Sequence, residues 1–208
     1  AGLLLFVLLC VIPSIIGSQT FDAVIATTEA SRALDYNNGK KLALSPDGTL
    51  SLIFTNNNGV YYSELRPDSS NWSTPLNLSN SEGIFAHPAI VVDSKNKKHV
   101  VWQDNSTASG PASEDLRIFY RQVTSTGAIE HIAIPIGEAV GDCITPSIAI
   151  DADDTLIVAW SADMGLGLGK EINYSIGTPV KGPSGFYSWT YPSIPGNDMG
   201  MGSSLFPS

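Results

Sequence analysis

The stretch LALSPDGTLSLIF, residues 42–54, decides the fold because it recurs twice more along the chain. The other copies are IVVDSKNKKHVVW, residues 90–102, and IAIDADDTLIVAW, residues 148–160, and the copies begin 48 and then 58 residues apart. Each copy is an apolar strand, a tight polar turn and a second apolar strand that ends on an aromatic residue. Self-similarity at this spacing indicates one supersecondary unit that is used repeatedly.

Extended outward, each copy predicts four strands. Period-two alternation, β-branched and aromatic residues, and Gly, Asn, Asp and Pro between the segments all favour strands. The expected strands are 41–45, 49–55, 60–65 and 72–78 in the first unit, 88–93, 98–103, 116–123 and 128–134 in the second, and 146–151, 155–161, 171–176 and 185–191 in the third. Four-stranded antiparallel units at this spacing predict an all-β fold, a partial β-propeller.

The N-terminal residues 1–20 form an apolar leader, in which AGLLLFVLLCVIPSII (1–16) carries no charge. We expect an apolar helix here that acts as a secretory signal. Two alternatives stay open: a retained membrane anchor, although about 20 residues are needed for a span, and a pilin-like helix in a filament core. Residues 21–208 are expected to form the partial propeller.

The propeller is expected to contain about three blades, at roughly 37–80, 81–137 and 138–200, with a further blade beginning near residue 204. Residues 23–27 resemble the outermost strands and are expected to complete a last blade. Because three blades are too few to close a ring, the expectation is that the natural protein continues.

Charge and cysteine content exclude several classes of function. The net charge is −9 with only 11 Lys and Arg, and no basic stripe exists, so we expect no nucleic-acid partner and membrane contact only through residues 1–16. Cys143 is the single cysteine outside the leader, so no internal disulfide framework is expected, and a structural thiol is the favoured interpretation.

Four sequons are candidate glycosylation sites: Asn71, Asn77, Asn105 and Asn173.

In a propeller, the connections from the fourth strand to the next blade and from the second to the third strand open on one face, where ligands usually bind. The candidate binding residues on this rim are Glu82, His87, Asp104, Asp115, Glu138, Asp142 and Asp163. Paired carboxylates there could act as acid and base for glycoside hydrolysis. The favoured interpretation is that they are solvated loop residues, and no catalytic residue is assigned.

The remaining polar patterns are better explained by structure. Asp151, Asp153 and Asp154 suit a tight turn better than a calcium loop, which would need Gly at its sixth place. The three histidines share no metal-ligand spacing, so we expect no metal and no cofactor. His99 is expected to be a packed or edge residue. Trp102 and Trp160 are expected in the core, and Trp72 and Trp189 either in the core or on a sugar-stacking surface.

The chain resembles the sialidase-like, BNR-repeat propeller superfamily. The shared pattern is Pro-x-Ile-x-x-Asp, a polar turn, an apolar strand ending in Trp, and an Ile/Phe-x-Tyr strand. It is present as PAIVVD (88–93) with Trp102 and IFY (118–120), and as PSIAID (146–151) with Trp160 and INY (172–174). The resemblance implies the propeller fold, on which glycosidases, lectins and adhesion modules all occur.

The departures from the family bear on activity. The nearest match to the Asp-box of the family, RPDSSNW (66–72), lacks its Gly, and the Arg-Ile-Pro motif of true sialidases is absent. The sequence therefore predicts an exported or cell-surface propeller module that binds an extracellular glycan or a surface protein without catalysis. A secreted sialidase-like glycoside hydrolase and a pilin-like filament subunit are the alternatives.

Overall fold

The computed structural model describes residues 28, 34, 39–56, 59–79, 85–105, 116–137, 142–163, 169–182 and 185–190. They form an all-β structure of three antiparallel sheets, each with four strands in chain order. The first sheet holds β1 (Leu42–Leu44), β2 (Leu50–Asn56), β3 (Gly59–Leu65) and β4 (Leu76–Asn77). The second holds β5 (Phe85–Val92), β6 (Lys98–Asp104), β7 (Arg117–Val123) and β8 (Ile134–Gly137). The third holds β9 (Cys143–Ile150), β10 (Leu156–Asp163), β11 (Lys170–Pro179) and β12 (Tyr187–Trp189).

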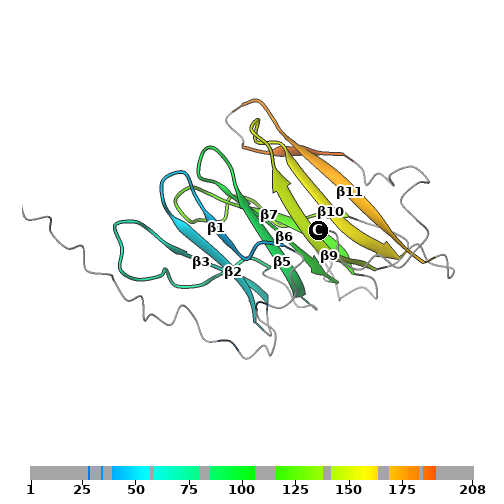
Figure 1. Ribbon diagram of the computed structural model, residues 1–208, viewed down its shortest axis with the longest axis horizontal. Helices are drawn as coiled ribbons and strands as arrows, with labels where there is room; N and C mark the ends of the chain where they lie inside the picture. Colours follow the sequence, from blue (N-terminus) through cyan, green and yellow to red (C-terminus); the bar gives the residue numbers. More distant parts are fainter. Residues whose placement is uncertain are drawn as a thin grey trace, which may run out of the picture.

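The sheets lie side by side in the order of the chain, with β1, β5 and β9 in equivalent places (Figure 1). The innermost strands are joined directly, because the Ile90 amide donates to the Lys40 carbonyl oxygen at 3.0 Å. A Cβ added to Gly39 would lie 2.5 Å from the Ala89 Cβ, so the close approach of these strands requires glycine. The arrangement is that of consecutive propeller blades, and the closing of a ring stays a prediction.

The turns between the first two strands of each sheet share one conformation. Gly48, Asn96 and Asp154 occupy the same repeat position and have φ values of 86°, 64° and 62°. Gly, Asn and Asp are the residues that best tolerate the left-handed region. The repeat therefore carries the turn signal in three different residue types.

Two apolar cores fill the seams between the sheets. The first seam, between the first and second sheets, buries Ile53, Tyr62 and Trp102. The second seam, between the second and third sheets, buries Tyr120, Leu156 and Trp160. Trp102 and Trp160 are fully buried, which confirms their predicted place in the core. Each sheet thus depends on its neighbour to cover one apolar face.

The fourth strand of a sheet is shorter than the sequence predicted, or begins further along the chain. β4 has two residues, because Pro75 lacks an amide and the Ser73 hydroxyl takes over part of the pairing by accepting from the Glu64 amide at 3.0 Å. The predicted strand 128–134 was wrong in its position: β8 begins only at Ile134, and among residues 128–133 only Ile129 forms a bridge, with Val123.

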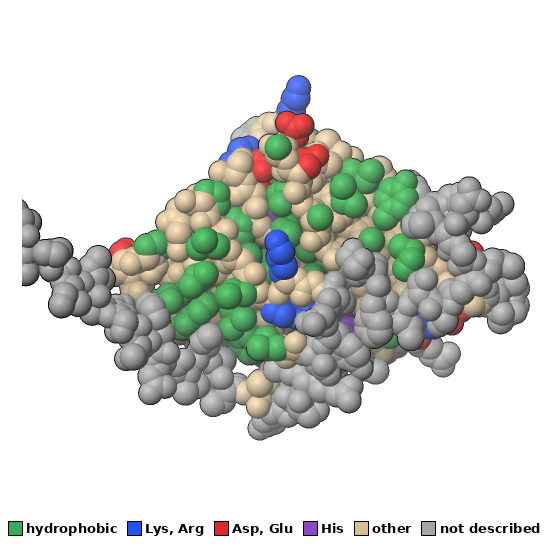
Figure 2. Space-filling model, viewed as in Figure 1, with side chains coloured by type: hydrophobic (Ala, Val, Ile, Leu, Met, Phe, Trp, Pro, Cys, Tyr) green, Lys and Arg blue, Asp and Glu red, His purple; other side chains and the backbone are tan. Residues whose placement is uncertain are grey.

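Apolar side chains remain exposed on the outer faces of the first and third sheets. Leu42 and Leu44 are 51% and 66% exposed, and Ile157 is 44% exposed. Figure 2 shows hydrophobic side chains gathered over the first sheet and over the third. Ile157 holds the repeat position of His99, which the third sheet covers completely. Each outer face therefore has the character of a surface on which another sheet packs.

The predicted helix and leader at residues 1–20, and the outer strand at 23–27, lie outside the described residues. Among the residues that are described, no helix is long and apolar enough to cross a membrane.

Candidate functional site: the inner rim

Two bulges shape the rim that the sequence selected. His87 and Thr145 hold the same position in β5 and β9, each directly before a proline, and have φ values of 52° and 54°. The β5–β6 pairing shifts its register between Ala86 and Ala89, and a matching shift occurs in the pairing of β10 with β9. Positive φ is unfavourable for residues other than glycine, and β-bulges often re-aim a side chain beside a functional site.

Each bulge is held by a side chain from the preceding sheet. The Lys41 ammonium donates to the Pro88 carbonyl oxygen at 2.5 Å, next to His87. The buried Gln103 accepts from the Thr145 amide through its side-chain oxygen at 2.9 Å. These contacts cross the first and second seams respectively, so each bulge is held from the preceding sheet, through the Pro88 carbonyl oxygen in one case and the Thr145 amide in the other. We call this end of the sheets the inner rim.

Two of the predicted rim carboxylates have structural contacts. Asp142 accepts the Leu116 amide through Oδ1 at 2.8 Å, and its carbonyl oxygen accepts the Asp163 amide at 2.9 Å. Asp104 is 1% exposed and accepts the Trp102 indole N–H at 3.2 Å. The Leu116–Asp142 bond joins the second and third sheets, whereas the Asp104 bond lies within β6 and the Asp163–Asp142 bond within the third sheet. They favour a framework role for Asp104 and Asp142 over acid–base chemistry.

The structure brings four of the predicted rim residues to one end of the sheets: His87, Asp104, Asp142 and Asp163. Glu82, Asp115 and Glu138 lie outside the described residues. Lys41, Gln103 and Thr145 were not predicted from the sequence. The signal that could have found this site is the proline that recurs at the same repeat position, in His87-Pro88 and Thr145-Pro146.

The sequons differ in accessibility. Asn71 is exposed, while Asn77 and Asn105 are half-buried. Asn173 is only 3% exposed within β11, which disfavours a glycan there in the folded sheet, and glycosylation at the four sequons stays a prediction. Cys143 is buried as a free thiol and His99 is fully buried, as the sequence predicted for a structural thiol and a packed histidine.

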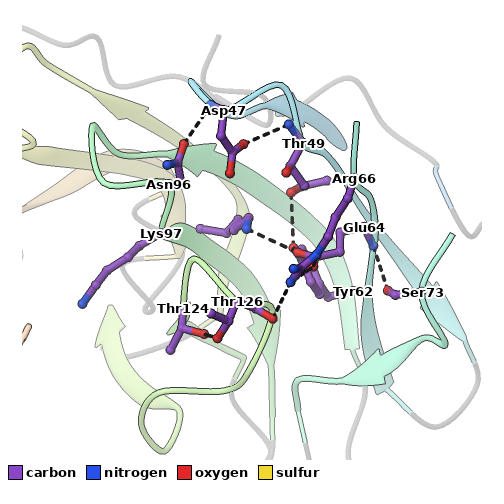
Figure 3. A network of polar contacts seen from close by, with 12 residues as sticks. Asp47, Thr49, Tyr62, Glu64, Arg66, Ser73, Asn96, Lys97, Thr124 and Thr126 are labelled. Carbon is purple, nitrogen blue, oxygen red and sulfur yellow. Dashed lines mark hydrogen bonds and ion pairs between the residues drawn. The ribbon is translucent and has the colours of Figure 1, made fainter. Parts of the chain in front are cut away.

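A second polar cluster occupies the first seam, at the opposite end of the sheets (Figure 3). The Glu64 carboxylate accepts from the Tyr62 hydroxyl at 2.5 Å and from the Arg66 Nε at 2.8 Å, and it lies 3.3 Å from the fully buried Lys98 ammonium. Burial opposes ionisation of Glu64, but the bonds from Tyr62 and Arg66 and the charge of Lys98 outweigh it and hold the pKa of the carboxyl below its ordinary value. Arg66 extends across the seam to the Thr126 carbonyl oxygen at 2.8 Å.

The equivalent place in the second seam holds a hydrogen-bonded chain. His99 lies with Nε2 3.4 Å from Asp93 and Nδ1 2.8 Å from the Tyr120 hydroxyl, which bonds the Gln122 side-chain oxygen at 3.2 Å. Burial of Asp93 opposes its ionisation, but the His99 contact and the backbone amides of Lys97 and Lys95 lower the pKa of this carboxyl overall. Burial raises the pKa of Tyr120, which therefore stays protonated.

Comparisons with known proteins gave similar solved structures but no matching family. No family model matches the chain, and no curated protein matches it, so the sialidase-like resemblance stays a prediction. Similar solved structures include an endo-arabinase from Bacteroides thetaiotaomicron, with 14% identity, a TM-score of 0.46, and coverage of 76% of this chain and 61% of that one. A polysaccharide lyase of family PL25, an ulvan lyase, has 12% identity and a TM-score of 0.48 over 77% of this chain and 46% of that one.

A xylan β-1,4-xylosidase from Bacillus halodurans has 18% identity and a TM-score of 0.39, covering 76% of this chain and 31% of that one. The chain thus spans less than two thirds of the length of these similar structures.

Proposed function

We propose that the protein is an exported β-propeller module that binds a glycan at the inner rim and does not change it chemically. The single observation that carries this proposal is the pair of strained, proline-preceding residues at the same place in two successive inner strands, His87 and Thr145. Backbone strain of this kind costs roughly 1–3 kcal/mol and persists where the surroundings enforce it, often at ligand sites.

The polar character of the rim supports a hydroxyl-rich ligand. The rim carries the half-buried imidazole of His87 and the half-buried carboxylate of Asp163, which lies beside the framework of Asp142. The net charge of −9 disfavours polyanions. Binding is favoured over hydrolysis because Asp104 and Asp142 already accept structural hydrogen bonds. Export rests on the apolar leader of residues 1–16.

The test compares His87→Gly with Asn96→Gly, since both residues have positive φ but lie at opposite ends of the second sheet. Glycine relieves backbone strain, so His87→Gly is expected to raise the free energy of unfolding by about 1 kcal/mol or leave it unchanged. It is also expected to weaken glycan binding roughly tenfold, a loss of ~1.4 kcal/mol. Asn96→Gly is expected to retain binding.

Binding would be measured on a glycan array and by calorimetry with the strongest array ligand, using the full-length protein. Equal binding by the wild type and the His87→Gly variant would contradict the proposal. Turnover of aryl glycosides by the wild type, with loss of turnover in His87→Gly, would replace binding by hydrolysis as the function of the rim.

A further inference from the structure

A recess of about 50 Å³ opens in the second seam, at the end of the sheets opposite the inner rim. Its walls include Asp93, Lys97, Gln122, Asp154, Phe186 and Tyr187. We call it the seam pocket. Figure 2 shows acidic and basic side chains close together at the end of the molecule where the β5–β6 and β9–β10 turns lie.

The pocket exists because two large side chains of the first seam have small or apolar counterparts here. In the first seam, Arg66 reaches across to the second sheet and Lys98 fills the space beside Glu64. At the corresponding repeat positions of the second seam stand Thr124 and Leu156. The short Thr124 side chain cannot bridge the seam as Arg66 does, so the space next to the Gln122 side chain stays unfilled.

The wall of the pocket has unused hydrogen-bonding capacity. The Lys97 ammonium donates to both oxygens of Glu130 at 2.9 Å, which leaves one of its three N–H groups. Gln122, 2% exposed, donates one amide N–H to Glu130 and keeps the other. Asp154 accepts from the Ser94 amide and hydroxyl at 2.8 and 2.6 Å, which uses about half of its lone pairs.

The charged groups of the wall are of both signs, Asp93 and Asp154 on one side of the balance and Lys95 and Lys97 on the other, and Lys97 is also paired with Glu130. An ionic ligand would meet a like charge as well as an opposite one, whereas a hydroxyl group can accept from a remaining N–H and donate to a remaining carboxylate lone pair. Among the described residues, no cluster of three or more His, Cys, Asp or Glu could hold a metal ion. The wall therefore favours a neutral, hydroxyl-bearing ligand.

An aromatic platform stands at the lip of the pocket. Phe186 is 51% exposed and stacks on His131, with ring centroids 4.1 Å apart and planes 17° apart, so its orientation is fixed. The Tyr187 hydroxyl is held by the Asp154 carbonyl oxygen at 3.0 Å. The apolar face of a sugar ring packs favourably on such an exposed aromatic ring.

From these contacts we infer that the seam pocket is a second binding site, for the hydroxyl edge of a neutral sugar whose ring lies over Phe186. The volume holds about three to five water-sized groups, which suits two or three hydroxyls but not a whole ring. The site goes beyond the inner rim, because it lies at the other end of the sheets and uses none of the rim residues.

The experiment uses methyl glycosides of glucose, galactose, mannose, xylose and arabinose as probes, with saturation-transfer NMR on the full-length protein and titration of the responding probe. Phe186→Ala is the main variant, because an exposed side chain can be removed without unfolding the sheet. Ile132→Ala is the matched control, since Ile132 is 75% exposed and does not line the pocket.

The expected result is that Phe186→Ala weakens binding of the responding probe roughly tenfold, while Ile132→Ala stays within about twofold of the wild type. His87→Gly is also expected to leave binding at the seam pocket unchanged, which separates this site from the inner rim. The inference is overturned if no probe shows saturation transfer, if Phe186→Ala binds like the wild type, or if only His87→Gly abolishes the signal.

Discussion

Replacing Lys98 by leucine tests whether the buried residue pair of the first seam can be exchanged for the corresponding pair of the second seam. Lys98 is fully buried and Glu64 nearly so, at 0% and 6% side-chain exposure. Removing one partner of a buried pair typically costs 3–5 kcal/mol, because the other charge remains without compensation. Arg66 still bonds the opposite oxygen of Glu64, so we expect the lower end, about 3 kcal/mol.

The chain itself supplies the rescuing substitution. At the corresponding positions of the second seam stand Gln122 and Leu156, both buried. The double variant Glu64→Gln/Lys98→Leu copies that solution, so it should lie within about 1 kcal/mol of the wild type. Glu64→Gln alone leaves the Lys98 ammonium buried and is expected to cost about as much as Lys98→Leu.

The free energies of unfolding would come from urea denaturation of the four proteins, compared as a double-mutant cycle after a check that the denaturant dependence is unchanged. The expected coupling energy exceeds about 2 kcal/mol. Additive losses, or a Lys98→Leu variant within about 0.5 kcal/mol of the wild type, would refute the reasoning.

Two further predictions concern the same polar clusters. The pKa values of Glu64 and Asp93 are lowered in the folded protein, so their contribution to stability is complete above the unfolded-state values of about 4.3 and 3.9 and is lost as the pH falls through the lower folded values. Urea unfolding midpoints measured from pH 6 downward should show this loss of stability. The loss should be smaller in the Glu64→Gln/Lys98→Leu variant, which lacks the Glu64 carboxyl. Gly127→Ala should destabilise by more than about 1 kcal/mol, because φ is 84° and the new Cβ would lie 2.9 Å from Glu64 Oε1. Gly169→Ala is the control, because φ is 92° and open space surrounds the new Cβ, so this variant measures the backbone cost alone. Thermal unfolding would compare the two variants, and an equal drop in Tm would mean that the Glu64 contact adds nothing.

The repeat predicted the hairpins well because their determinants are local. Gly48, Asn96 and Asp154 occupy one turn position, and all three adopt the left-handed conformation that their residue types allow. The fourth strands were predicted less well because prolines and side-chain bonds decide them. Pro75 removes a ladder donor and Ser73 replaces part of the pairing, an outcome that alternation of apolar residues does not reveal.

The polar clusters were not predictable from the pattern, because their partners come from different sheets. Lys98 lies in a repeat position that is otherwise leucine, and Glu64 stands 34 residues before it. A lysine in an otherwise apolar position was a signal that a buried partner exists, but the partner is chosen by the packing of one sheet on the next. The same holds for His99, whose position was recognised as packed although its Asp93 and Tyr120 contacts were not.

The two seams show how one repeated framework can differ in what it presents to a ligand. Where Arg66 and Lys98 surround a buried carboxylate, the seam is closed by its own charges. In the second seam, Thr124 and Leu156 occupy the corresponding positions, the ion pair is formed nearer the surface by Lys97 and Glu130, and a pocket is present. Because each seam has its own core, such exchanges can accumulate at one seam without disturbing the next. Binding capacity can therefore arise between sheets, independently of the rim loops.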